Sequence, residues 1–347
     1  MGLLTGSSEE SWKPSITSDT TARSYWLNWR VLLCGVWIII AVFLASILIR
    51  KYEPFCSRRS RGGGETEQGK AEILYDEETF SPCLKGVQPA WLLGFRALAF
   101  ALLLLMLIAA VVVDGPSIYY YYTQWTCTLI TIYFGLGLLL SVRGCFKNHN
   151  AAGGERINNV EIDSERGISA ASTPAENFIK SISSKAPDPH IDQARQTSGF
   201  WGYALQILFQ VNAGAVVLTD CVFWLIIVPF LMEKHYRLSF LDINMHTINV
   251  VLLLIDAALN CLRFPLFRIA YFFSWTVFFV IFQWILHACV PIWWPYPFLD
   301  LSSRYAPIWY LSVALMHLPC YGVFALVIKL KHSLLARWFL QSYQYAR

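Results

Sequence analysis

The chain has 347 residues, of which 56% are apolar and only 14% are charged. Soluble domains carry about one quarter charged residues, so this composition excludes an ordinary water-soluble protein and indicates an integral membrane protein. The formal net charge is only +4, and the basic residues interrupt apolar segments, which argues against nucleic acid as a partner. The nine cysteines include no C-x-x-C pair and no Cys/His spacing suited to zinc, so we predict neither a metal nor another cofactor.

Seven segments are long and apolar enough to cross a bilayer, which takes about 20 mostly apolar residues. The predicted fold class is therefore all-α: a polytopic membrane helix bundle of about seven transmembrane helices with disordered cytosolic loops. The fourth segment contains several polar residues and is either one long tilted helix or a helix with an unwound end. Pro265 is expected to help end the fifth. The seven segments are residues 31–49, 91–113, 125–142, a stretch within 203–232, 245–262, 269–290 and 308–328.

The lysines and arginines predict the orientation, because cytosolic loops of multi-pass proteins are enriched in them. With seven spans, twenty of the 27 basic residues lie on the side that holds the C-terminus, six lie on the other side, and Arg96 lies within a helix. We therefore predict an N-terminus that is outside the cell or lumenal and a C-terminus that is cytosolic. The organelle and the oligomeric state stay open.

The predicted organisation is one membrane core with additions. The segments 58–70 and 148–198 are polar, rich in Gly, Ser and Ala and poor in aromatics, so we expect both to be disordered. The predicted parts are a polar N-terminal segment (1–30), an additional first transmembrane helix (31–49), a basic cytosolic loop (50–90), a six-helix core (91–331) with an insertion at 148–198, and a cytosolic tail (332–347).

Arg96, Asp220 and Asp256 fall inside predicted spans, where a charge is costly. Arg96 is near the cytosolic end of its helix, so we expect its side chain to reach the membrane surface and assign it no function. Asp220 and Asp256 lie deeper. Each either hydrogen-bonds to Thr, Gln or Asn on a neighbouring helix or has a functional role.

His246 and the threonines of the third span are the candidate reactive groups. On the predicted orientation, the third and fifth spans both enter the membrane from the outer side. Thr128 then lies about one turn inside its helix and His246 within the first turn of the fifth helix, so a hydroxyl and an imidazole share the same depth. The structural alternatives are an interfacial histidine and threonines that bond to the carbonyl four residues earlier. His287 and the aromatic segment 291–307 lie at the same level.

Two short motifs carry a family resemblance. The sequence NMHT at 244–247, followed by an apolar run and Asp256, resembles the androgen-induced-protein and Rolling stone group of multi-pass proteins. The sequence WPYPFLD at 294–300 is similar to the aromatic signature of that family, and TQW at 123–125 matches the opening of its threonine-containing helix more loosely. The resemblance covers about two-thirds of the chain, from Trp91 to Lys331.

The resemblance implies a threonine hydrolase, because animal members of this family cleave fatty-acid esters of hydroxy fatty acids with a Thr nucleophile and a His. His246 matches the catalytic histidine. The family's threonine falls four residues after the Trp, which is Leu129 here, so Thr128 is the first candidate for the nucleophile and Thr131 the alternative. Asn244, Thr247 and Tyr296 are candidates for stabilising the oxyanion. No cofactor is implied, and the expected partners are the lipid bilayer and a lipid-ester substrate.

A non-enzymatic function is the alternative. Rolling stone-type members have membrane and developmental roles without an established reaction, and a fold alone does not determine function. A scaffold or adaptor would use the cytosolic loops for docking. A transporter would use Asp220 and Asp256 in a proton path, although the chain has no convincing internal repeat.

Overall fold

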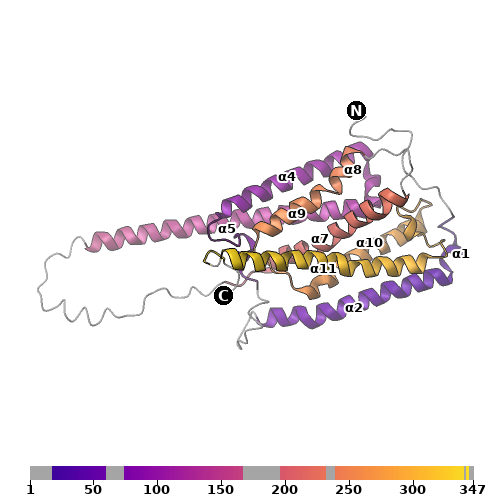
Figure 1. The fold of residues 1–347 in the computed structure, drawn as a ribbon, viewed down its shortest axis with the longest axis horizontal. Coiled ribbons are helices and arrows are strands. Elements are labelled where there is room, and N and C mark those ends of the chain that lie inside the picture. The colour runs from indigo at the N-terminus through magenta and orange to yellow at the C-terminus, as the bar shows by residue number, and fades with distance from the viewer. Residues whose placement is uncertain (1–17, 60–73, 167–195, 232–238, 340, 344–347) are drawn as a thin grey trace, which may run out of the picture.

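The computed structural model of the chain is a bundle of long helices (Figure 1). It describes residues 18–59, 74–166, 196–231, 239–339 and 341–343. Within these residues, the only β-type pairings are three isolated bridges, so the predicted all-α fold is confirmed.

Seven helical segments are long and apolar enough to span a membrane, as predicted. The chain is therefore a multi-pass membrane protein. The segments are α2 (Trp29–Arg59), α4 (Pro89–Asp114), α5 (Tyr122–Arg166), α7 (Phe200–Val222) with η3 (Phe223–Leu231), α8 (Phe240–Met245) with α9 (Ile248–Leu259), α10 (Ile269–Cys289) and α11 (Ala306–Trp338). The shorter elements are α1 (Arg23–Trp26), η1 (Asp76–Thr79), η2 (Pro116–Tyr120), η4 (Leu266–Arg268) and η5 (Pro297–Leu299).

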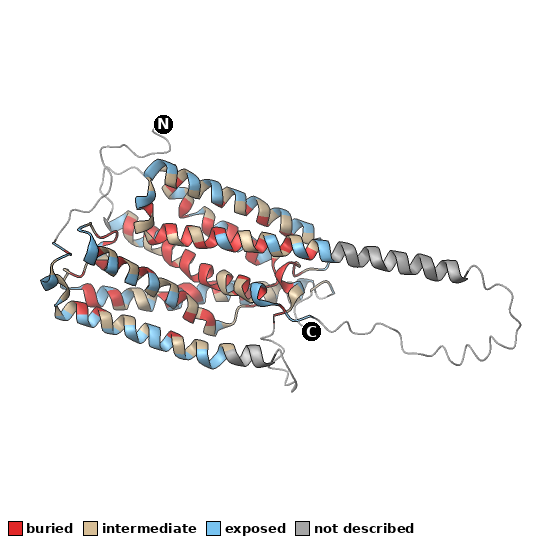
Figure 2. Ribbon diagram, turned by 180° about the vertical axis from the view of Figure 1, so that it is seen from behind, coloured by how far each residue is buried: buried red, intermediate tan, exposed pale blue. Residues whose placement is uncertain are grey.

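Apolar side chains cover the outside of the bundle as well as its interior, as expected where lipid is the solvent. On α2, Leu32, Ile39 and Phe43 are all more than 60% exposed. The central helix is α7, more than half of whose residues are buried. Figure 2 shows the buried residues gathered between the helices and the exposed ones along the outer faces.

Glycines allow two close approaches within the bundle. A Cβ at Gly214 of α7 would clash with the ring of Phe272 on α10. A Cβ at Gly144 of α5 would clash with Phe80, which follows η1. Small residues at such contacts let membrane helices pack through van der Waals contact, which is the main attraction available within lipid.

Arg96 is fully buried, so the prediction that it reaches the membrane surface is wrong. Its Nε donates to Asp256 Oδ1 on α9 at 3.0 Å, and its Nη1 donates to the Thr79 carbonyl and to Ser141 Oγ, both at 2.8 Å. The reason is that η1 and the neighbouring helix α5 cover the end of α4 that the sequence analysis placed near water. Asp256 also accepts hydrogen bonds from Tyr133 and Asn260, so its carboxylate is fully paired.

Two further ion pairs lie near this end of the bundle, which also holds the C-terminal residues. Arg263 Nη2 is 2.9 Å from Glu78 Oε1, and Arg268 Nη2 is 2.9 Å from Glu53 Oε1. Both guanidinium groups are buried. These pairs attach η1 and α2 to the turn that joins α9 to α10.

Several predicted boundaries differ from the structure. Helix α5 continues to Arg166, so the stretch predicted to be disordered from residue 148 begins as helix (Figure 1). The segment 74–89 is packed against the bundle within the predicted loop 50–90, whereas residues 60–73 and 167–195 lie outside the described residues. Helix α9 ends at Leu259, well before Pro265, and Asn260, the next residue, donates from Nδ2 to Asp256 Oδ2 at 2.7 Å. The fourth span continues as helix, of π type, through Leu231.

We predict that Arg96→Ala lowers the free energy of unfolding by about 3–5 kcal/mol, because it leaves the Asp256 carboxylate buried without its countercharge. Replacing both partners, in Arg96→Met with Asp256→Leu, is expected to cost less than the single change. Unfolding of the purified protein in mixed micelles with increasing SDS measures both values.

Arg143→Ala is the matched control, since Arg143 is exposed on α5 and its removal should cost within about 0.5 kcal/mol. Equal losses for the Arg96 and Arg143 variants would contradict the structural importance of the buried pair.

Candidate functional site

His246 occupies a break between two helices. Ser239 caps the start of α8: its hydroxyl accepts from the backbone N–H of Asp242, whose carboxylate accepts from the Ser239 N–H. Helix α8 ends at Met245, and α9 begins at Ile248. The break frees the His246 carbonyl, which accepts a hydrogen bond from Trp224 Nε1 at 2.9 Å. The histidine is thus held by its backbone at a bend, a few residues from the end of the span.

Two side chains flank the imidazole of His246, which is only 7% exposed. Its ring stacks on Phe223, the first residue of the π-helix η3, with centroids 3.7 Å apart and planes 5° from parallel. Its Nδ1 is 3.5 Å from Asp220 Oδ1, longer than a well-formed hydrogen bond but an ion-pair distance. Asp220 is therefore the partner of His246, and the opposite ring nitrogen, Nε2, faces away from it.

The π-helix has a local cause. Pro229 lies inside η3 and has no backbone N–H to donate, so the regular hydrogen-bond pattern of α7 cannot continue through it. Short π-helical insertions occur frequently at functional sites. Here the insertion directs Phe223 and Ile227 toward the same cavity as His246.

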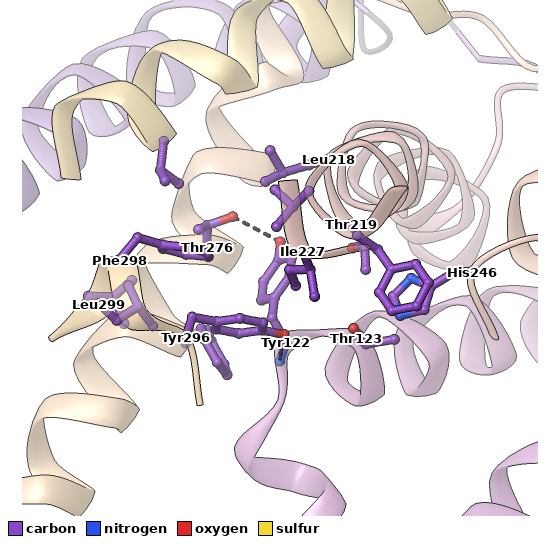
Figure 3. A pocket seen from close by; sticks show the side chains of 15 residues that line it. Tyr122, Thr123, Leu218, Thr219, Ile227, His246, Thr276, Tyr296, Phe298 and Leu299 are labelled. Atoms are coloured by element: carbon purple, nitrogen blue, oxygen red, sulfur yellow. Dashed lines mark hydrogen bonds between the residues drawn. The ribbon is translucent and has the colours of Figure 1, made fainter. Parts of the chain in front are cut away.

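An apolar cavity lies beside His246. In Figure 3, Thr123 and Thr219 lie next to His246, whereas Thr276 lies across the cavity from it. The described residues that line the cavity are Tyr122, Thr123, Leu218, Thr219, Val222, Phe223, Ile227, His246, Thr276, Phe279, Val280, Tyr296, Phe298, Leu299 and Val313.

The two threonines predicted from the sequence are outside this lining. Thr128 Oγ1 donates to the Gln124 carbonyl at 2.8 Å, and Thr131 Oγ1 donates to the Cys127 carbonyl at 2.7 Å. Both hydroxyls thus make the helix-internal bond that was the structural alternative. The threonine of α5 that lines the cavity with His246 is Thr123, in the first turn of the helix.

Tyr296 connects the aromatic segment to the start of α5. Its phenol oxygen accepts from the backbone N–H of Tyr122 at 3.1 Å. The first N–H groups of a helix have no partner within the helix, so the phenol acts as its cap. Burial raises the pKa of Tyr296 to about 12, so the group keeps its proton at neutral pH and can donate as well as accept. Asn244 and Thr247, the other predicted oxyanion groups, are outside the lining.

Contacts with His287 and Tyr25 fix the position of the aromatic segment. Trp294 stacks on His287 with centroids 3.6 Å apart and donates from Nε1 to the Tyr25 oxygen at 3.1 Å. Tyr25 in turn donates to Asp300 Oδ1 at 3.1 Å. His287, predicted to lie at the level of the site, therefore supports the segment that caps α5 and does not line the cavity.

The sequence contained one usable signal for Thr123. It belongs to the TQW opening that resembles the start of the family's threonine helix, but spacing from Trp125 pointed further along the chain. Asp220 was identified as buried, and its partner was not. Among the residues that the structure describes, no group of three or more His, Cys, Asp or Glu is arranged to hold a metal ion.

Comparisons with known proteins add no relative. No family model, no curated protein and no solved structure matches this chain.

We predict that Tyr296→Phe lowers the free energy of unfolding by about 1–2 kcal/mol, since the Tyr122 N–H loses its acceptor in a buried position. SDS-driven unfolding of the purified variant measures the loss. The matched control is Tyr305→Phe, at a tyrosine that is 56% exposed. If the two variants are equally stable, Tyr296 does not cap α5.

Proposed function

We propose that the protein is a hydrolase of lipid esters that uses His246 as general base and a threonine hydroxyl as nucleophile. The observation that carries this proposal is that an imidazole paired with a carboxylate lines one apolar cavity together with threonine hydroxyls. A nucleophile, a base and a group that orients the base are the parts that covalent ester hydrolysis requires. The resemblance to the androgen-induced-protein and Rolling stone group supports the same reaction.

Thr123 is our preferred nucleophile. It lines the cavity beside His246, together with Tyr296. Thr219 also lines the cavity, but its hydroxyl donates to the Ala215 carbonyl at 2.6 Å. The hydroxyl proton of Thr219 is therefore already in a hydrogen bond within the helix. Thr128 and Thr131 stay predictions from the family's spacing and are included in the test below.

The reaction proceeds in two steps. Neutral His246 accepts the hydroxyl proton of Thr123 at Nε2 as the threonine oxygen attacks the ester carbonyl, and the alcohol leaves with that proton. Water then attacks the acyl-threonine with His246 again as base, which releases the carboxylic acid and restores the hydroxyl. Asp220 stabilises the imidazolium formed in each step. Tyr296, which stays protonated, is the candidate donor to the oxyanion.

The cavity determines the class of substrate. Apart from the imidazole, no described residue of its lining is ionisable near neutral pH, so a charged headgroup would lose its hydration without gaining a partner. Esters whose flanking groups are hydrocarbon fit this lining. Fatty-acid esters of hydroxy fatty acids, the class that the resemblance implies, have hydrocarbon on both sides of the ester bond, and their free carboxylate, at the end of the hydroxy-acid chain, then lies outside this lining.

We predict that His246→Ala lowers kcat/KM for a hydroxy-fatty-acid ester by at least about a thousandfold, since the nucleophile loses its base. Thr123→Ala is expected to abolish turnover and covalent labelling by a fluorophosphonate probe, whereas Thr128→Ala and Thr131→Ala keep both. Mass spectrometry of the labelled peptide identifies the modified residue. His332→Ala, at a histidine near the other end of the bundle, is the control and keeps full activity.

Labelling at Thr128 or Thr131 would move the nucleophile to the position expected from the family. Labelling that persists unchanged in His246→Ala would remove this histidine from the chemistry. A purified, folded protein without any turnover would favour the non-enzymatic alternative of a scaffold, an adaptor or a transporter-like protein.

We predict a smaller effect for Asp220→Asn. The amide keeps the shape of the side chain but does not stabilise the imidazolium, so kcat should fall by about a hundredfold or more while KM changes little. Steady-state kinetics separates the two parameters. An increase of the same size in KM, with kcat unchanged, would assign Asp220 to substrate binding.

A further inference from the structure

A second apolar cavity lies next to the first, between α2, α10 and α11. The only ionisable side chain near neutral pH among the described residues of its lining is His317. The residues that line this cavity alone are Trp37, Ile38, Ala41, Phe273, Val277, Tyr310, Ala314 and His317.

The two cavities meet at a shared wall. Thr276 and Val280 on α10 are four residues apart and therefore lie on the same face of the helix. The five residues that line both cavities are Thr276, Val280, Phe298, Leu299 and Val313. These side chains, and not a layer of helix, separate the two spaces.

The polar groups at this wall are already paired. Tyr122 and Thr276 hydroxyls are 2.9 Å apart, and Thr276 Oγ1 is 2.8 Å from His317 Nε2. His317 Nδ1 is 2.7 Å from the Val313 carbonyl, which can only accept, so Nδ1 carries the proton and Nε2 accepts from Thr276. The Tyr122 hydroxyl then donates to Thr276. Because these groups hydrogen-bond to one another, a ligand does not need to supply a donor or an acceptor here, so the wall is compatible with a plain hydrocarbon chain.

We infer that the two cavities are one site for a single long hydrocarbon chain, with the second cavity holding its far end. This inference rests on the proposed function: the ester lies beside His246, and one acyl chain passes Thr276 and Val280 and ends between α2, α10 and α11. The occupant is an uncharged chain because the lining offers no countercharge to a headgroup. Helix α2, the additional first span, thereby forms part of the substrate site.

The site selects chains by fit. Bilayer hydrocarbon is as apolar as the cavity, so a chain gains no hydrophobic free energy by leaving the membrane. Short chains are accommodated beside His246 alone, whereas long chains need the second cavity. A bulky side chain in the second cavity should therefore act on long substrates selectively.

The test uses two filled-cavity variants, Ala314→Trp on α11 and Ala41→Phe on α2, which narrow the second cavity from different walls. We expect each to lower the ratio of octadecanoyl-ester to hexanoyl-ester hydrolysis by about tenfold or more, because overpacking opposes only the longer chain. Val323→Trp, at a side chain of α11 that is 55% exposed, is the matched control and should leave the ratio unchanged. An unchanged ratio in both filled-cavity variants, with unfolding midpoints like that of the unmodified protein, overturns the inference.

A binding measurement keeps this inference separate from the proposed reaction. The His246→Ala protein is photolabelled with an octadecanoyl ester that carries a diazirine at the chain end, and the labelled peptides are mapped by mass spectrometry. We expect labels around Ala41 and Ala314 that an excess of unlabelled ester removes. If the unmodified protein shows no turnover but these labels appear in the His246→Ala protein, the hydrolase proposal is refuted and the chain-binding site is supported. Labels confined to the lipid-facing residues, or to the His246 cavity, refute the chain site.

Discussion

The absence of hydrogen-bonding solvent in a bilayer is the constraint on which the rest of this structure depends, because each buried polar group needs a partner within the protein. Arg96 and Asp256 satisfy it together, and their shared network brings α4, α5, α9 and η1 into contact. The buried pairs of Arg263 and Arg268 extend this arrangement to α2. With the helices held at that end, the opposite ends of α5, α7 and α9 meet around His246.

The sequence predicted the seven spans because the length of an apolar segment depends on bilayer thickness and not on neighbouring helices. It could not predict the partner of Arg96, because distance from a helix end says nothing about which segment covers that end. For the same reason the site was predicted only in part. His246 was identified from its motif, whereas the place of Thr123 rather than Thr128 in the lining depends on the rotation of α5 and on the cap from Tyr296.

The candidate site combines parts with different mechanical roles. The bend at His246 and the π-helix at Phe223 are departures from regular helix, and each turns a side chain toward the cavity. The aromatic segment around Tyr296 is held by Trp294 and Tyr25 and supports the first turn of α5. Regular helices with fully bonded backbones provide the frame.

The separation of 160 positions between Arg96 and Asp256 has a consequence for biosynthesis. Translation at about 5–20 residues per second delivers Asp256 on the order of ten seconds after Arg96 has left the ribosome. During that interval the guanidinium of the second span has no carboxylate partner, and an unpaired charge within a transmembrane helix is costly. The second span is therefore made before the carboxylate that pairs with Arg96 in the folded protein exists.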